Sequence, residues 1–198
     1  MINTLRGPVA LVGASMGGIA SFNAVGTSNP PIARALVMVD VTLQAPRAGV
    51  ERIRNFMVAN TDGFASLEEA ADAVAAYNPE RRRPQSPEGL LKNLRKRPDG
   101  RYNWHWDPRM MSMSQTVEPP EFTSALVAVS SHVMIPTLLV RGGRSDVVTD
   151  ETVADMKRLV PQTEVYEVPG AGHMVAGDRN DAFNDGVITF LRRYHPAR

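Results

Sequence analysis

Four short runs of apolar, β-branched residues constrain the fold of this chain more than any other feature. They cover residues 9–13, 35–39, 137–140 and 164–168. Apolar character that is continuous rather than alternating is typical of strands buried on both faces of a parallel sheet. Stretches with helical spacing separate the runs, so we predict an α/β fold.

Three segments carry the helical pattern. Residues 17–26 form a helix-length segment of small residues between the first two runs. Residues 150–160 and 181–194 each place apolar side chains on one helix face: Val153, Met156, Leu159 and Val160 in the former, and Phe183, Val187, Phe190, Leu191 and Tyr194 in the latter.

The stretch 46–120 interrupts this alternation with no convincing strand and two helix starts. Ser66-Leu-Glu-Glu69 is a capping box, and Ser86-Pro-Glu88 combines an N-cap, a first-turn proline and an acid. We therefore predict a core of residues 1–45 and 121–198, and a helical cap or lid at 46–120.

Composition excludes several classes of protein. The chain has 198 residues, a formal charge of +1 and no cysteine. A balanced charge argues against a nucleic-acid or membrane-surface protein, and without cysteine there is no disulfide framework or thiolate chemistry. No apolar stretch approaches the roughly 20 residues of a membrane span, and the first residues lack a signal-peptide pattern. We expect a cytoplasmic protein.

A candidate nucleophile follows the first run directly. Gly13-Ala-Ser15-Met-Gly17 is a G-x-S-x-G motif between a predicted strand and a predicted helix, the context of a nucleophile elbow. The serine of such a turn is strained, so its neighbours two positions away must be small, and its Oγ stands at a helix start that favours negative charge. The alternative is a nucleotide-binding turn, although the glycines do not follow G-x-G-x-x-G spacing.

A serine nucleophile needs a base and an orienting acid. Asp146 comes after the third run and His173 after the fourth, so Ser15, Asp146 and His173 follow the Ser-Asp-His order of such hydrolases. All three come after strands, where an open α/β sheet binds its ligands. The alternatives are that Asp146 caps a helix and His173 is an ordinary loop histidine.

Other polar residues are weaker candidates. Asp40 ends the second run and is the alternative acid, although we favour a structural role for it. Asp178 is expected to cap the last helix. No metal site is expected, because the remaining histidines lack carboxylate partners at ligand spacing. The eight basic residues within 81–101 favour a solvated surface over a docking patch.

These motifs resemble the serine-nucleophile branch of the α/β-hydrolase superfamily. The resemblance extends from Leu11-Val-Gly-Ala-Ser-Met-Gly-Gly18 to Gly170-Ala-Gly-His-Met-Val-Ala-Gly-Asp178. Within the insertion, Gly63-Phe-Ala-Ser-Leu-Glu-Glu-Ala70 and Asp99-Gly-Arg-Tyr-Asn-Trp-His-Trp-Asp-Pro108 are similar to bacterial hydrolases labelled non-haem, cofactor-free haloperoxidases.

The resemblance implies roles for particular residues. Ser15 is the nucleophile, His173 the base and Asp146 the acid, and the Met16 main-chain N–H is one oxyanion donor. The lid residues Trp104, Trp106 and Met110 are candidates to line an acyl pocket, with lid core as the alternative. The family has further strands before the elbow, so we expect a partial fold that lacks its N-terminal strands, either because Met1 is a misplaced start or because the chain associates with another.

The expected function is hydrolysis of a small, mainly apolar carboxylic ester or related acyl substrate through an acyl-enzyme, without a cofactor. One alternative keeps the triad and lets hydrogen peroxide replace water, as in a haloperoxidase. The other is a truncated, non-catalytic fragment. We expect a small-molecule substrate and no nucleic-acid or membrane partner, and the sequence leaves a homo-oligomer open.

Overall fold

A computed structural model of the protein describes residues 9–79, 83, 86–107 and 119–195, with the main chain alone at 119–122. The chain divides into two compact units. The core unit comprises Met1–Val50 and Pro119–Arg198, and the insert unit comprises Glu51–Glu118. The insertion expected at residues 46–120 overlaps the insert unit.

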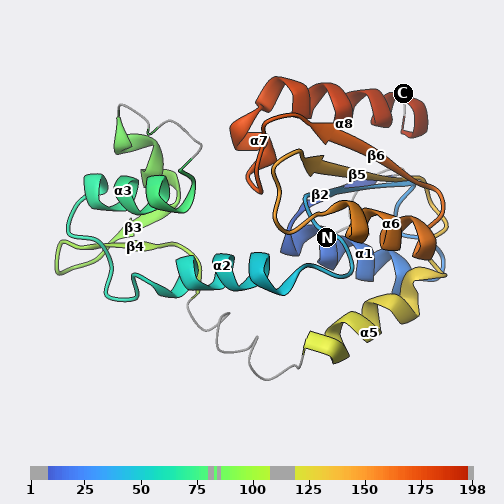
Figure 1. The fold of residues 1–198 in the computed structure, drawn as a ribbon, viewed down its shortest axis with the longest axis horizontal. Helices are drawn as coiled ribbons and strands as arrows, with labels where there is room; N and C mark the ends of the chain where they lie inside the picture. The colour runs from blue at the N-terminus through green and yellow to red at the C-terminus, as the bar shows by residue number, and fades with distance from the viewer. Residues whose placement is uncertain (1–8, 80–82, 84–85, 108–118, 196–198) are drawn as a thin grey trace. The chain divides into compact units, whose positions relative to one another are not determined.

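The core unit is built on a parallel sheet in the order β1-β2-β5-β6 (Figure 1). Its strands are β1 (Ala10–Ala14), β2 (Ala35–Val39), β5 (Thr137–Gly142) and β6 (Thr163–Val168). Each neighbouring pair is parallel, which confirms the predicted α/β architecture. All of β2 is buried, whereas β1 pairs with β2 alone among the described strands. Val12 in β1 is accordingly 49% exposed.

Helices cover both faces of this sheet (Figure 1). One face carries α1 (Met16–Thr27), α5 (Pro119–Ser130) and α6 (Asp150–Leu159), and the other carries α8 (Asn180–Tyr194) after the short α7 (Val175–Asp178). The predicted stripe of α8 buries Val187 and Phe190 against β2 and β5, while Tyr194 at its end remains exposed.

The ends of α6 show why this segment is helical. Thr149 and Thr152 form a reciprocal capping box, with acids in the first turn and bases in the last. That arrangement satisfies N–H groups at the helix start and complements the helix dipole. Met156 and Val160 are then buried, as the spacing predicts.

The insert unit contains α3 (Leu67–Tyr77), a 3₁₀ helix η2 (Pro87–Lys92) and two strands, β3 (Leu94–Lys96) and β4 (Tyr102–Trp104). The helix α2 (Arg47–Val58) leads into it. Ser66 caps α3 as predicted, accepting from Glu69 N–H at 3.1 Å. The segment after Ser86 forms a 3₁₀ helix without a side-chain cap.

The expectation of no strand in the insertion is wrong. β3 and β4 pair antiparallel around a turn at Gly100, where φ is +86°. A glycine tolerates this conformation, and Pro98-Asp-Gly100 is a turn signal that identifies the hairpin. The hairpin buries Leu94 against Phe64 and Ala70.

Of the helices in the described residues, none combines the length and hydrophobicity that a bilayer crossing requires.

Candidate active site

Ser15 occupies a strained turn between β1 and α1. Its φ is 48° and its ψ is −120°, a conformation that costs a non-glycine residue about 1–3 kcal/mol. Its main-chain N–H donates to Val39 O at 2.9 Å, which anchors the turn beside the end of β2. As N-cap of α1, Ser15 makes no side-chain capping hydrogen bond. The hydroxyl is therefore not used to cap the helix.

Two of the neighbouring glycines allow this turn. A Cβ on Gly13 would lie 2.3 Å from Gly17 O, and a Cβ on Gly18 would lie 2.7 Å from Val41 Cγ1. A Cβ on Gly17 would meet nothing within 4 Å. The tight packing predicted for both motif glycines is therefore found at Gly13 and shifts from Gly17 to Gly18.

Asp40 leaves β2 in a similarly unusual conformation, with φ of 49° and no exposed surface. Its main-chain N–H donates to Val140 O at 2.7 Å, and its Oδ1 accepts from Gly142 N–H at 2.8 Å. Its Oδ2 accepts from the Ser145 hydroxyl at 2.6 Å. These donors stabilise a carboxylate in a buried position.

His173 contacts this carboxylate directly. Its Nδ1 lies 2.8 Å from Asp40 Oδ2, and the imidazole is 11% exposed. Because the carboxylate oxygen is an acceptor, Nδ1 carries the hydrogen in the neutral ring. Nε2 is then the basic nitrogen. Within the described part of the chain no hydrogen bond joins Ser15 Oγ to His173, and such bonds often tighten only when substrate binds.

The loop that carries His173 is held by main-chain contacts. Arg144 N–H donates to Ala171 O at 2.9 Å, and Gly172 N–H donates to Asp178 Oδ2 at 3.0 Å. The loop passes so close to Gly142 that a Cβ there would lie 2.3 Å from Gly172 O. Asp178 thus ends α7 and holds the histidine loop, and the N-cap of α8 is Arg179 instead.

The acid beside His173 differs from the one favoured by the sequence. The sequence analysis favoured Asp146, which follows the third run, and kept Asp40 as the alternative, whereas the structure pairs the imidazole with Asp40. Asp40 is the first residue after β2, and β2 is the neighbour of β1. Asp146 lies four residues beyond the end of β5, and its main chain packs against Gly49. The carboxylate in contact with His173 is therefore that of Asp40.

The remaining predicted site residues are Met16 in the core unit and Trp104, Trp106 and Met110 in the insert unit. Met16 is the first residue of α1, so its N–H has no partner within its own helix. Trp104 and Trp106 stack with ring centroids 4.7 Å apart in the insert unit, near Phe56. Met110 lies outside the described residues. The acyl pocket from Trp104, Trp106 and Met110 stays a prediction.

Basic residues of the insert unit make local structural contacts. Arg101 donates to Asp62 O at 2.9 Å and to Gly63 O at 2.6 Å, and Arg97 pairs with Asp99. Arg83 pairs with Asp72 at 2.7 Å.

Among the described residues no group of three or more His, Asp or Glu side chains could hold a metal ion.

Arg141 links the carboxyl ends of β5 and β6 to the start of α6. Its guanidinium hydrogen-bonds Asp150 and pairs with Glu167 at 2.9 Å. The hydrogen bond with Asp150 raises the pKa of Arg141, burial opposes this effect, and the charge of Glu167 adds to it. The guanidinium thus stays charged and braces the strand ends that bear the site.

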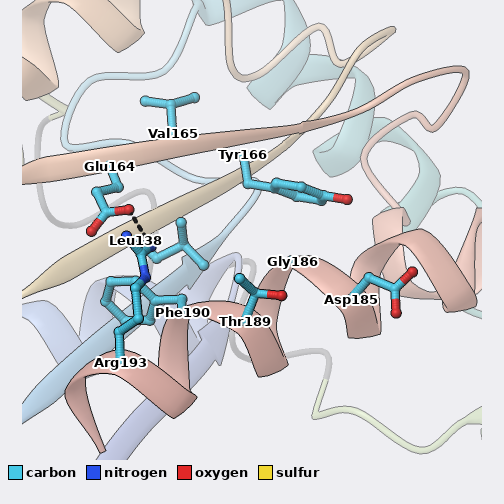
Figure 2. A pocket seen from close by; sticks show the side chains of 9 residues that line it. All are labelled: Leu138, Glu164, Val165, Tyr166, Asp185, Gly186, Thr189, Phe190 and Arg193. Carbon is cyan, nitrogen blue, oxygen red and sulfur yellow. Dashed lines mark hydrogen bonds and ion pairs between the residues drawn. The ribbon is translucent and has the colours of Figure 1, made fainter.

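A separate surface hollow lies between β6 and α8 (Figure 2). Glu164 and Arg193, which pair at 2.5 Å, lie at one end, and Tyr166 and Gly186 lie further along. Leu138 and Glu164 pair near the amino ends of their strands. Ser15 and Asp40 follow strand carboxyl ends, so this hollow is not the candidate active site.

A parallel sheet with a strained serine after one strand, and a carboxylate–imidazole pair at the ends of its neighbours, defines an α/β-hydrolase fold. The chain belongs to the alpha/beta hydrolase family, whose model matches residues 1–186.

Two bacterial relatives illustrate this family membership. A 3-hydroxybutyrate-oligomer hydrolase of Cupriavidus necator is 26% identical over 170 residues, which are 81% of this chain and 57% of that protein. An esterase of Mycobacterium tuberculosis is 29% identical over 175 residues, which are 85% of this chain and 56% of that protein. The chain thus spans little more than half the length of these curated relatives.

A solved structure shows the same fold. The crystal structure of E-2-(acetamidomethylene)succinate hydrolase matches with a TM-score of 0.81 and 25% identity, covering 96% of this chain and 69% of that one. These likenesses are to hydrolases and esterases, and the narrower likeness to haloperoxidases stays a prediction.

Proposed function

We propose that this chain carries the catalytic residues of a serine hydrolase acting on a small, mainly apolar carboxylic ester or related acyl compound. The observation that carries the proposal is the bond between His173 Nδ1 and Asp40 Oδ2, at 2.8 Å, at the strand end beside the strained Ser15. The names of two relatives, an esterase and a 3-hydroxybutyrate-oligomer hydrolase, agree with hydrolysis of an ester.

In the proposed reaction Ser15 Oγ attacks the carbonyl carbon while His173 Nε2 takes the hydroxyl proton. Asp40 accepts from Nδ1–H, fixes the tautomer and stabilises the imidazolium that forms. The carbonyl oxygen becomes an oxyanion near the start of α1, where the Met16 N–H is one proposed donor. Collapse of this intermediate breaks the bond to the alcohol, which leaves with the proton from His173.

The acyl-enzyme is then hydrolysed. His173 takes a proton from water, the resulting hydroxide adds to the acyl carbon, and the carboxylic acid leaves as the proton returns to Ser15 Oγ. The residues Trp104 and Trp106 remain candidates for the acyl-binding surface, because their stacked rings offer an apolar area in the insert unit.

Fluorophosphonate labelling of the purified, folded protein tests the proposal, together with hydrolysis of p-nitrophenyl esters of graded acyl length. We expect labelling and hydrolysis by the wild type, and neither by Ser15→Ala. Peracid formation from hydrogen peroxide and acetate at a higher rate than ester hydrolysis would instead favour haloperoxidase chemistry. Folded wild-type protein that neither labels nor hydrolyses any ester would identify a non-catalytic fragment.

A further inference from the structure

Ser145 lies in the loop after β5, and its hydroxyl reaches the acid of the site. The main-chain N–H of Ser145 donates to Gly142 O at 3.0 Å, which fixes the turn at the end of the strand. The side-chain Oγ lies 2.6 Å from Asp40 Oδ2. One hydrogen bond therefore links the Ser145 hydroxyl to the Asp40 carboxylate, and a second links that carboxylate to the imidazole of His173.

The direction of this hydrogen bond is determined by the other partners of the hydroxyl. A serine hydroxyl has one proton to donate and two lone pairs that accept. Val147 N–H donates to Ser145 Oγ at 3.2 Å and Val148 N–H donates at 3.1 Å. Since both lone pairs are occupied, the proton points to Asp40.

The bond from Ser145 holds the carboxylate independently of the histidine. Gly142 N–H fixes Oδ1 of Asp40, while Oδ2 is shared between the Ser145 hydroxyl and His173 Nδ1. Without the hydroxyl, Oδ2 would have His173 as its one remaining partner among these three donors. The carboxylate would then follow the movements of the imidazole during proton transfer. A hydroxyl hydrogen bond to a charged group in a buried site resists that rotation.

We propose that Ser145 is a positioning residue of the proposed hydrolase: its hydroxyl orients the Asp40 carboxylate toward His173 Nδ1. This inference rests on the proposed function for its kinetic consequence. Ser145 acts through Asp40 and does not touch the reacting atoms. Its loss lowers kcat by about 10- to 100-fold with KM little changed, because a hydrogen bond to a charged group contributes to the transition state.

Two substitutions at Ser145 test the proposal. Ser145→Ala removes the hydroxyl, and Ser145→Thr keeps it on a slightly larger side chain. The matched control is Ser130→Ala, which removes the hydroxyl of a buried serine whose partner is Val127 O in α5. We expect a lower kcat in Ser145→Ala, recovery of most of it in Ser145→Thr, and wild-type kcat in Ser130→Ala.

Proton NMR of His173 distinguishes failure of this inference from failure of the proposed function. The Nδ1–H bonded to a buried carboxylate is expected to give a far-downfield resonance, which His173→Gln identifies by its loss. We expect this resonance to shift or broaden in Ser145→Ala and to be kept in Ser145→Thr. That comparison needs no substrate, so it applies even if the wild type hydrolyses no ester.

Wild-type kcat together with an unchanged resonance in folded Ser145→Ala would overturn the proposal. If that variant does not fold, Ser145→Cys replaces it, because a thiol occupies the same place and donates weakly. The same downfield signal and kcat in Ser145→Cys as in the wild type would again overturn it. For Ser145→Cys, a kcat and a downfield signal weaker than in the wild type and Ser130→Ala, but not lost as in His173→Gln, would support the proposal.

Discussion

Gly142 donates its main-chain N–H to the side chain of Asp40, at 2.8 Å. Asp40 N–H donates to Val140 O, so in a continued parallel ladder Gly142 would bond the main-chain carbonyl of residue 40. The positive φ of Asp40 ends the strand, and its Oδ1 takes the place of that carbonyl. One side chain thus completes the sheet with one oxygen and contacts His173 with the other.

Substitutions of Asp40 should separate these two roles. Asp40→Asn keeps an oxygen for Gly142 and a side chain that tolerates positive φ, so it should fold, with ester hydrolysis reduced by roughly 10²–10⁴-fold. Asp40→Ala also leaves the buried Gly142 N–H without its acceptor, at about 1–3 kcal/mol in the free energy of unfolding. Urea denaturation and kcat measure the two effects. Equal stability of both variants would contradict the ladder role.

Asp146→Asn tests the assignment of the acid. Because His173 is bonded to Asp40, we expect this variant to hydrolyse esters within about threefold of the wild type. The measurement is kcat at saturating ester, beside Asp40→Asn. A loss in Asp146→Asn as large as that in Asp40→Asn would instead favour Asp146 as the acid.

Gly142→Ala should displace the loop that carries His173. The new Cβ would lie 2.3 Å from Gly172 O and 2.6 Å from Ala171 O, so the main chain of the loop must move. A shift of that kind lowers activity by about 10²-fold. Gly143→Ala is the matched control, since its Cβ would meet a Glu167 side-chain oxygen at 3.3 Å, which can rotate away. Kinetics and thermal unfolding of the pair check the prediction, and equal activities would refute it.

The two motif glycines around Ser15 should respond differently to alanine. Gly13→Ala places a Cβ 2.3 Å from Gly17 O, so we expect a loss of about 1–3 kcal/mol in the free energy of unfolding and weaker labelling of Ser15. Gly17→Ala meets open space within α1 and should raise stability by up to about 1 kcal/mol. Chemical denaturation with fluorophosphonate labelling compares them. A Gly17→Ala variant as damaged as Gly13→Ala would show that the motif requires both.

The core sheet could be predicted because its strands are short, continuous apolar runs between helical stretches, and burial on both faces imposes that pattern. The hairpin was missed because Leu94-Arg-Lys96 and Tyr102-Asn-Trp104 are short and partly charged, and burial of Leu94 stabilises a strand that its neighbours do not indicate. Pro98-Asp-Gly100 was the available signal.

The strained turn at Ser15 and the loop that carries His173 were predictable from the sequence, whereas the carboxylate beside His173 was ambiguous. The strand-turn-helix motif identifies Ser15, and the glycines before His173 indicate a loop that returns over the sheet. Asp40 and Asp146 both follow strands, and chain order does not say which carboxylate reaches the imidazole. The signal for Asp40 was its position directly after a fully buried run, where a charged group needs several donors.

The position of Ser15 on β1 has a consequence for how activity is lost. Among the described strands β1 has one neighbour, β2, and Val12 at its centre is half-exposed. Strands with few partners open by local fluctuation at a lower free energy than the centre of a sheet. Ser15, the proposed nucleophile, therefore follows a less protected strand of the described sheet, while Asp40, the proposed acid, follows the fully buried β2. Mild denaturant should inactivate the protein before its sheet unfolds.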